Sequence, residues 1–432
     1  MSDLVLSIDI GTSSVRVAAV RVDGQITHQL RRKLPPQSPS PGLVEFDAML
    51  LATTIESLAN ELINAVGAVA AVGITNQRAS TVAWDVTTGK TLMPAIGWQD
   101  LRTVFDCIMA KAEHGIGLAP NQSATKMKWL LSNIDASVAR SNIRLATLDT
   151  WIAWWLSGGS VFVTDHSNSA VTGLTSIETL DWDPRTLATL EIDRAHLPEI
   201  TTTVGQHGVA SRLQGSPPIT ALVGDQQGSL VGQGCLSGGE AKITFGTGAM
   251  LDVVTGTKTP ASAARSKFGT FPIITRSDAN AVTWGVEAIM LSAGTNIEWL
   301  IEDMGLIESA EQSEPIALSV PSADGVVYIP ALLGLGTPNW DYGARGTLLG
   351  LTRGTTRAHI VRAVLEGIAN RGADLVEAAR AETGLAINTI RIDGGMSRNR
   401  VFTKALADAS QAHIEIANDP ESTTLGAAFL AG

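Results

Sequence analysis

Val223-Gly224-Asp225-Gln226-Gln227-Gly228 is the stretch around which the chain is organised. The apolar run before it, residues 219–223, predicts a short buried strand, and the small and apolar residues 226–236 predict a helix. Asp225 therefore stands where a strand ends and a helix begins, the place where open α/β sheets bind ligands. A strand-end aspartate is most often only a helix cap, and Asp225 taken alone would be interpreted in that way.

The composition is typical of a folded globular protein. The chain has 432 residues with 44% hydrophobic content, so at about 150 residues per domain we expect two or three domains. The net charge is −11, from 42 acidic and 31 basic residues, which argues against nucleic acid or an anionic membrane as a partner. No apolar run approaches the about 20 residues that span a bilayer.

The cysteine content and the N-terminus indicate a cytoplasmic enzyme. Cys107 and Cys235 are the two cysteines in a long chain, which is typical of a reducing compartment. Met1-Ser2-Asp3-Leu4 lacks the basic start and the small-residue cleavage site of a signal peptide. No cysteine and histidine spacing resembles a zinc site.

The two halves of the chain begin and end alike. Residues 8–12 and 241–248 each predict a strand followed by a tight Gly-Thr turn. The small-residue helix that ends the first half has a counterpart in residues 426–432. This repeat predicts an α/β protein of two similar domains facing one central cleft, residues 1–236 and 237–432, each a mixed sheet flanked by helices.

The two Gly-Thr turns offer the chemistry of a phosphate clamp. Glycine lets the backbone approach a ligand, and successive N–H groups with hydroxyls form an anion-binding concavity. Thr12, Ser13 and Ser14 provide these groups at the first turn, and Asp9 at the strand tip can hold hydrated Mg²⁺. No Gly-Lys-Ser/Thr and no helix follows, which excludes a P-loop and a dinucleotide loop. One such turn is most simply an ordinary hairpin, but two turns with Asp225 between them favour a phosphate clamp.

A third glycine motif lies near the end of the chain. Residues 390–399 predict a strand, the double glycine Gly394-Gly395 and a helix. A double glycine lets a flat ring lie against the backbone, and Asn399, one turn into the helix, can reach a purine or ribose edge. A plain loop between strand and helix is the alternative, and it would be preferred if the motif stood alone.

Taken together, these motifs resemble those of the FGGY carbohydrate kinases, a family of the actin-like ATPase superfamily, and within it those of the glycerol kinases. The resemblance runs from Ser7 to Gly432, nearly the whole chain. The matching segments follow the family's order: IDIGTSS (8–14), GITNQR (73–78), WQDLRT (98–103), SATKMKW (123–129), GDQQ (224–227), TFGTG (244–248), GLGTPNW (334–340) and ARGTLLGLTRG (344–354).

The resemblance implies two actin-like, ribonuclease H-like domains that phosphorylate a small polyol or sugar hydroxyl with ATP and Mg²⁺. Asp225 would be the general base, and Asp9 and Asp225 would help to bind Mg²⁺. The substrate would be held by Arg78, Trp98, Asn121, Asp225, Gln226 and Met250. ATP would be bound from both halves by Thr12, Ser13, Ser14, Arg16, Gly246, Thr247, Gly294, Glu298, Gly394, Gly395 and Asn399. Phosphoryl transfer is mostly positioning and charge stabilisation, so a carboxylate of ordinary basicity suffices as the base.

Several positions depart from the glycerol kinase pattern. Ala79 stands where an acidic residue is expected after Arg78, Asn121 stands where a tyrosine is expected, and Met250 stands where a phenylalanine is expected. Losing a carboxylate and a phenol removes acceptors for substrate hydroxyls and enlarges the pocket. We therefore expect a substrate other than glycerol, such as a larger polyol or a ketose. Glu298 stands where the glycerol kinases have a glutamine, a change that the pocket can accommodate.

Two other classes of function stay open. An actin-like ATPase switch would hydrolyse ATP without an acceptor, but such a switch has no use for Arg78, Trp98 and Gln226. The three departures on the substrate side keep open a catalytically impaired, ligand-sensing relative, against which Asp9 and Asp225 argue. We expect a small-molecule polyol or sugar as the partner, and neither nucleic acid nor a membrane. The sequence leaves open whether the chain forms a homodimer.

Overall fold

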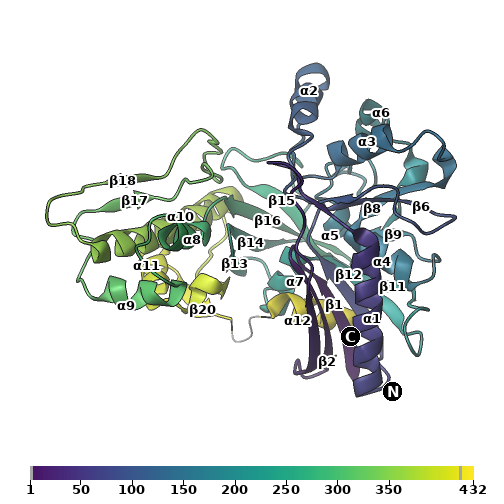
Figure 1. Cartoon of the computed structure of the whole chain (residues 1–432), viewed down its shortest axis with the longest axis horizontal. Helices are drawn as coiled ribbons and strands as arrows, with labels where there is room; N and C mark the ends of the chain where they lie inside the picture. The colour runs from purple at the N-terminus through teal and green to yellow at the C-terminus, as the bar shows by residue number, and fades with distance from the viewer. Residues whose placement is uncertain (1–2, 418–420) are drawn as a thin grey trace.

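The computed structural model describes residues 3–417 and 421–432, which form two lobes (Figure 1). The N-terminal lobe is built on a six-stranded sheet in the order β11-β12-β5-β1-β2-β3. β1 pairs antiparallel with β2 and parallel with β5, and β5 pairs parallel with β12. The strands of this sheet are β1 (Leu4–Ile10), β2 (Ser14–Arg21), β3 (Ile26–Lys33), β5 (Ala71–Asn76), β11 (Val204–Val209) and β12 (Pro218–Gly224).

The C-terminal lobe has a six-stranded sheet in the order β15-β16-β14-β13-β19-β20, of which β16-β14-β13-β19-β20 repeats the pairing of β3-β2-β1-β5-β12. β13 pairs antiparallel with β14 and parallel with β19, and β19 pairs parallel with β20. The strands are β13 (Ala241–Phe245), β14 (Ala249–Gly256), β15 (Phe271–Ser277), β16 (Val282–Met290), β19 (Thr389–Gly394) and β20 (His413–Ile416). The two mixed sheets expected from the repeated Gly-Thr turns are therefore confirmed.

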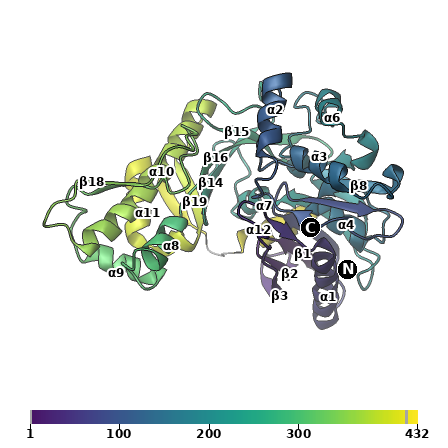
Figure 2. The ribbon, with the colours of Figure 1, turned by 45° about the horizontal axis from the view of Figure 1, so that its top comes forward.

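Helices cover both sheets. Apolar residues of α1 (Ala48–Val66) join the core under β1 and β2, and Asp47 caps this helix by accepting from the backbone N–H groups of Met49 and Leu50. Figure 2 shows α10 (Arg357–Thr383) and α11 (Arg400–Ser410) on the C-terminal lobe, and their apolar residues join the core of that sheet. No helix in the described part of the chain combines the length and apolarity needed to cross a membrane.

Smaller elements complete the lobes. The N-terminal lobe carries a four-stranded sheet of β4 (Glu45–Phe46), β7 (Ala95–Ile96), β6 (Thr81–Asp85) and β8 (Ile143–Thr147), and a pair of β9 (Val163–Asp165) and β10 (Glu199–Thr201). Its helices include α2 (Val104–His114), α3 (Ala124–Asn133), α4 (Leu148–Leu156), α5 (His166–Ser169) and α6 (Pro184–Leu190). The C-terminal lobe adds β17 (Val327–Ile329), β18 (Thr347–Leu349), α8 (Thr295–Glu302) and α9 (Ser313–Leu318).

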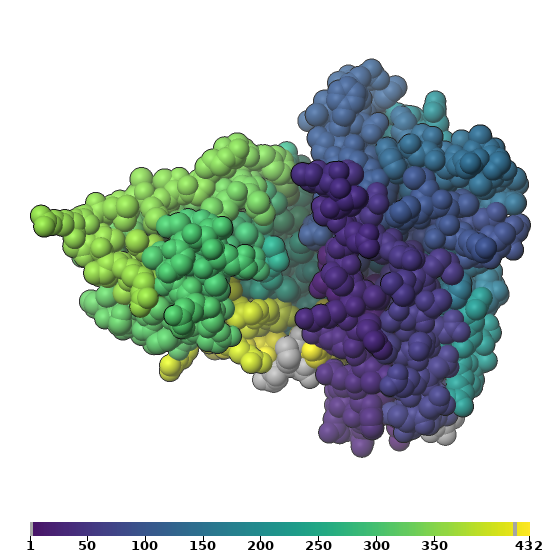
Figure 3. Space-filling view, viewed as in Figure 1, coloured from purple at the N-terminus to yellow at the C-terminus, as the bar shows by residue number. Residues whose placement is uncertain are grey.

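Two helices cross where the lobes meet. α7 (Asp225–Gly232) follows β12 and is shorter than the helix predicted for residues 226–236, because glycines stand at 232 and 234. α12 (Ser422–Ala431) comes from the end of the chain but packs on β1, β5 and β12 of the N-terminal sheet. In the space-filling view the yellow C-terminal residues emerge between the green and purple lobes (Figure 3). The chain therefore ends by returning to its first sheet.

The α7–α12 crossing brings two helix backbones into direct contact. A Cβ atom added at Gly426 would lie 1.8 Å from the carbonyl oxygen of Gly228, and one added at Gly232 would lie 1.8 Å from that of Ser422. The hydroxyl of Ser7 donates to the carbonyl of Thr424 at 2.8 Å, which ties α12 to β1. Only glycine allows the two helices to approach this closely.

Substitution of a crossing glycine is expected to destabilise the whole fold. Gly426→Ala should lower the free energy of unfolding by on the order of 3 kcal/mol, because α12 must move away from α7. Thermal melting of the purified variant measures the effect. Gly117→Ala is the matched control, since a Cβ there meets nothing within 4 Å. Equal melting temperatures for the two variants would contradict the backbone contact described here.

Candidate active site

Three predicted site residues meet because their strands are parallel neighbours. β12, β5 and β1 lie side by side and run in the same direction. Asp225 follows β12 directly, Arg78 stands two residues after β5, and Asp9 is the penultimate residue of β1. The carboxyl ends of parallel strands lie at one sheet edge, where ligands of open α/β sheets bind.

Asp225 is held by a cation and a backbone N–H group. The Nε of Arg78 lies 3.6 Å from Oδ1 of Asp225, and the backbone N–H of Gln226 donates to the same oxygen at 2.8 Å. Burial raises the pKa of Asp225 above its ordinary value, while Arg78 opposes this shift and Asp9 adds to it. The N-cap of α7 is Gly224, without a side-chain capping bond, so capping does not explain Asp225.

Asp9 forms the second carboxylate of the site. Its Oδ2 lies 3.3 Å from Nη1 of Arg16 and accepts from Thr424 Oγ1 at 3.1 Å. Arg16 also pairs with Glu421, so the start of α12 reaches this point. Burial raises the pKa of Asp9, and Arg16 opposes the shift.

The donor set of Asp9 and Asp225 fits Mg²⁺. Both carboxylates are partly buried, and the Asp9 charge disfavours ionisation of Asp225, a repulsion that a cation would relieve. Mg²⁺ is commonly bound through one or two carboxylates together with water and substrate phosphates. Within residues 3–417 and 421–432 there is no cluster of three or more His, Cys, Asp or Glu that could hold a metal alone. The two carboxylates would therefore share the ion with water and phosphate.

The first Gly-Thr turn contacts the substrate side of the site. Ser13 and Thr12 lie in the turn between β1 and β2, which is closed by a bond from Gly11 N–H to the Ser14 carbonyl at 3.0 Å. Thr12 Oγ1 accepts from the indole Nε1 of Trp98 at 3.2 Å. Trp98 is fixed in turn by Lys126, whose Nζ donates to its carbonyl at 3.0 Å. A predicted substrate residue and a predicted phosphate residue are thus in direct contact.

The second Gly-Thr turn is joined to other residues expected at the ATP site. Gly246 and Thr247 are exposed, and the backbone N–H of Gly294 donates to the Gly246 carbonyl at 2.9 Å. The strand register sets Gly394 opposite Phe245, immediately before the turn. The structure therefore brings Gly246, Thr247, Gly294 and Gly394 together.

The remaining predicted ATP residues lie beside this group. Gly395 is exposed and opens the short helix η4 (Gly395–Arg398), and Glu298 is exposed in the first turn of α8. Asn399 is the N-cap of α11, and its Nδ2 donates to Ser313 Oγ at 3.0 Å. The side-chain oxygen of Asn399 serves as the cap of α11. An amide nitrogen carries two donors, so one N–H of Asn399 remains for a ligand.

The three residues that depart from the family pattern lie in different structural environments. Ala79 is buried, with a left-handed φ of 62°, a conformation that few alanines adopt. Asn121 is exposed in the loop before α3, and Ser123 ties this loop to Ala79 by donating to its carbonyl at 3.0 Å. Met250 is half-buried on β14, opposite Thr244.

The structure adds three charged residues that the sequence analysis did not select. Lys242, Asp252 and Glu287 are buried neighbours on β13, β14 and β16. Glu287 Oε2 lies 2.6 Å from Nη2 of Arg78, and Lys242 Nζ donates to Gln226 Oε1 at 2.6 Å. Burial raises the pKa of Glu287 to about 7, with Arg78 opposing and Asp252 adding to the shift. The signal that could have found them is a single charged residue within each of three otherwise uncharged strands.

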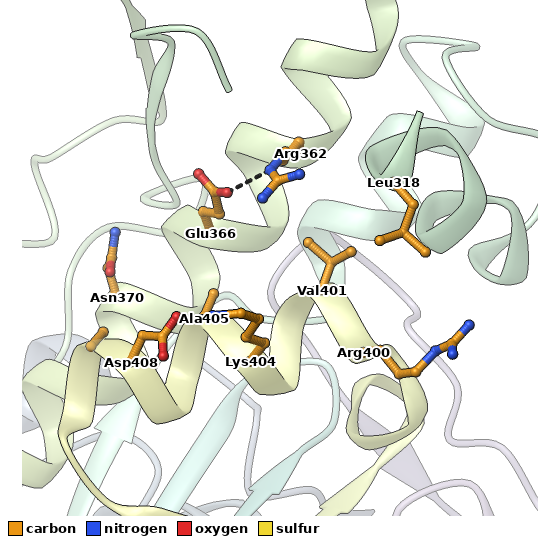
Figure 4. A pocket seen from close by; sticks show the side chains of 10 residues that line it. Leu318, Arg362, Glu366, Asn370, Arg400, Val401, Lys404, Ala405 and Asp408 are labelled. Atoms are coloured by element: carbon orange, nitrogen blue, oxygen red, sulfur yellow. Dashed lines mark hydrogen bonds and ion pairs between the residues drawn. The ribbon is translucent and has the colours of Figure 1, made fainter. Parts of the chain in front are cut away.

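A surface pocket lies apart from this constellation. It has a volume of about 590 Å³ and opens between α10 and α11, beside the end of α9 (Figure 4). Two ion pairs line it, Arg362 with Glu366 and Lys404 with Asp408. None of its lining residues is a predicted site residue. The site at the strand ends is therefore identified by its chemistry and not by pocket size.

Comparison with known proteins identifies the family of the chain. Residues 4–232 match the N-terminal domain, and residues 241–432 the C-terminal domain, of the FGGY family of carbohydrate kinases. A glycerol kinase of Shewanella oneidensis is 38% identical, over 99% of this chain and 90% of its own length. The crystal structure of Plasmodium falciparum glycerol kinase with ADP has a TM-score of 0.93 at 31% identity, covering 99% of this chain and 89% of that chain.

A more distant structure supports the fold alone. Xylulose kinase from Rhodospirillum rubrum has a TM-score of 0.86 at 23% identity, covering 99% of this chain and 89% of that chain. The resemblance drawn from the motifs and the two-domain, actin-like α/β fold are thus confirmed. The chain belongs to the FGGY family of carbohydrate kinases, enzymes that use ATP with Mg²⁺ to phosphorylate small polyols or sugars.

Proposed function

We propose that this kinase transfers the γ-phosphoryl group of ATP to a hydroxyl held beside Asp225, which takes the hydroxyl proton as general base. The main observation behind this proposal is that Arg78, which pairs with Asp225, also pairs with Glu287 of the opposite lobe. Gln226, next to Asp225, likewise accepts from Lys242 of that lobe. Phosphoryl transfer needs a positioned base more than a strong one. The raised pKa of Asp225 makes its carboxylate a somewhat better proton acceptor.

The two Gly-Thr turns are proposed to hold the ATP phosphates from opposite lobes. Thr12, Ser13 and Ser14 supply hydroxyls and N–H groups from the first turn, and Gly246 and Thr247 supply N–H groups from the second. Arg16 adds a cation beside Asp9. Mg²⁺, when bound, neutralises charge on the phosphates, and Asp9 with Asp225 would hold it.

The adenosine end is proposed to lie against the C-terminal lobe. Gly294, Gly394 and Gly395 leave open backbone for a flat ring. Glu298 is exposed at the start of α8, and Asn399 keeps one N–H available. The hydrogen bond between Gly294 and Gly246 supports this assignment, because it links the ring site to the second phosphate turn.

Arg78 is proposed to bind a substrate hydroxyl in addition to Asp225. Its Nη1 is buried and has no hydrogen-bond partner among the described residues. A buried donor left unpaired costs about 1–3 kcal/mol, a cost that an accepting hydroxyl would remove. Trp98, which contacts Thr12, and Gln226, which contacts Lys242, are proposed to complete the substrate site.

We propose that the acceptor is a polyol or ketose larger than glycerol. Ala79 and Asn121 supply neither the carboxylate nor the phenol expected of a glycerol site, and Met250 replaces a rigid ring. Removing a hydrogen-bond acceptor weakens binding of the hydroxyl that used it. The same changes leave more room beside Arg78.

The division of the chain into two units and its cellular compartment are also part of the proposal. Units 1–236 and 237–432 are proposed as the two halves of the working enzyme, which is supported by their separate six-stranded sheets. A cytoplasmic location is supported by the two buried free thiols, Cys107 and Cys235, which fit a reducing compartment.

Removal of the proposed base should slow the chemistry. We expect Asp225→Asn to lower kcat by about 10²-fold or more, because the hydroxyl proton loses its acceptor. ADP release with saturating ATP and acceptor measures kcat, and calorimetry without acceptor checks that ATP is still bound. Wild-type turnover by this variant would contradict the assignment of Asp225.

A panel of acceptors tests the substrate. ADP release should depend on an added hydroxyl compound, with kcat/KM higher for tetritols, pentitols or pentuloses than for glycerol. Preference for glycerol would overturn this part of the proposal. Turnover without any acceptor would instead support an ATPase switch, and no turnover at all would support a ligand-sensing protein.

Restoring the missing groups should shift the preference. The double variant Ala79→Glu with Asn121→Tyr returns a carboxylate and a phenol to the site. We expect kcat/KM for glycerol to rise about fivefold, the value of one regained hydrogen bond. The same ADP-release assay measures it, with wild-type protein as the reference. A decrease for glycerol together with unchanged use of larger acceptors would contradict the proposed site.

A further inference from the structure

Lys242, Asp252 and Glu287 form one row across three strands of the C-terminal sheet. The β13–β14 register sets Lys242 opposite Asp252, and the β14–β16 register sets Asp252 opposite Glu287. Directly opposed residues in antiparallel strands place their side chains on the same face. The Nζ of Lys242 accordingly lies 2.8 Å from Oδ2 of Asp252. Here the row is called the charged row.

Each end of the charged row contacts a predicted substrate residue of the other lobe. Glu287 accepts from Arg78 at 2.6 Å, and Lys242 donates to Gln226 at 2.6 Å. Arg78 in turn pairs with Asp225, the residue that precedes Gln226. These contacts, together with the register that sets Asp252 beside Glu287, form a ring of neighbouring residues that leaves α7 at Asp225, crosses the C-terminal sheet and returns to α7 one residue later.

Because its side chains are buried, the charged row adds little net stability to the contact between the lobes. The side chains of Lys242 and Asp252 are fully buried, and that of Glu287 is 8% exposed. Buried ion pairs often stabilise a protein no more than apolar residues of the same volume would. Their contribution here is directional, because Glu287 fixes Arg78 and Lys242 fixes Gln226 on the opposite lobe.

The charged row also continues into the ATP site. β13 carries Lys242 and ends at Phe245, directly before the phosphate turn at Gly246 and Thr247. Displacement of β13 would therefore move Lys242 and the phosphate turn together. One strand thus connects the residue that fixes Gln226 to the predicted phosphate turn.

We propose that Glu287 and Lys242 are positioning residues of the acceptor site, acting through Arg78 and Gln226, with Asp252 aligning Lys242 between them. The inference rests on the proposed function, since it assumes that Arg78 and Gln226 bind the acceptor. Because the ring spans both lobes, the acceptor site is complete only when the C-terminal sheet lies against α7.

Loss of either end of the charged row should weaken acceptor binding selectively. We expect Lys242→Met and Glu287→Leu each to raise KM for the acceptor by about tenfold, the effect of one lost charge-assisted hydrogen bond. KM for ATP should change much less. Glu287→Gln should have a smaller effect than Glu287→Leu, because its amide oxygen can still accept from Arg78. Lys404→Met, on the outer face of α11, is the control and should behave as wild type.

Steady-state ADP release with glycerol, erythritol or ribitol as the varied acceptor tests these expectations. In a Gln226→Ala background, Lys242→Met should cause no further rise in the acceptor KM, because its effect passes through Gln226. Full additivity of these two changes, or equal rises in the KM for ATP and for the acceptor, would overturn the inference. Glu287→Gln is nearly isosteric, so its KM values decide the matter if the larger changes prevent folding.

The inference and the proposed function can fail separately. Wild-type protein that releases ADP without an acceptor would refute the proposed function. Acceptor-dependent wild-type turnover with unchanged acceptor KM in Lys242→Met and Glu287→Gln would refute only the positioning role.

Discussion

The position of Arg78 between two carboxylates from different lobes is the interaction on which the site depends. Its Nε lies 3.6 Å from Asp225 of the N-terminal lobe, and its Nη2 lies 2.6 Å from Glu287 of the C-terminal lobe. A guanidinium group presents its donors in a fixed plane, so two such contacts determine its orientation. The contacts around Asp225, the proposed base, are therefore complete only where the lobes meet, and the α7–α12 crossing lies at that point.

Much of the fold was predictable from local patterns. The Gly-Thr turns and the buried strands around them are encoded within a few residues, so the repeated sheets could be inferred from the sequence. The end of α7 was predicted too late, because the glycines at 232 and 234 were counted as part of the helix, whereas the chain leaves the helix after Gly232. The return of α12 to the first sheet also escaped prediction, since it depends on contacts with residues about 400 positions earlier, such as Ser7.

The candidate site residues that belong to sequence motifs could be predicted, whereas those that only the strand register aligns could not. Asp9 and Asp225 stand at strand tips, a feature that is visible in the sequence. Lys242, Asp252 and Glu287 are separated along the chain, and only the pairing of three antiparallel strands aligns them. Sequence similarity identifies the type of reaction, while this alignment places Glu287 and Lys242 against Arg78 and Gln226, the proposed acceptor residues.

A crystal structure with an unreactive ATP analogue, Mg²⁺ and the preferred acceptor tests the central claim most directly. We expect the acceptor hydroxyl to lie within about 3.2 Å of the Asp225 carboxylate and in line with the γ-phosphorus, with Arg78 still paired to Glu287. An acceptor bound elsewhere, with Asp225 turned away from both the hydroxyl and the phosphates, would contradict the account.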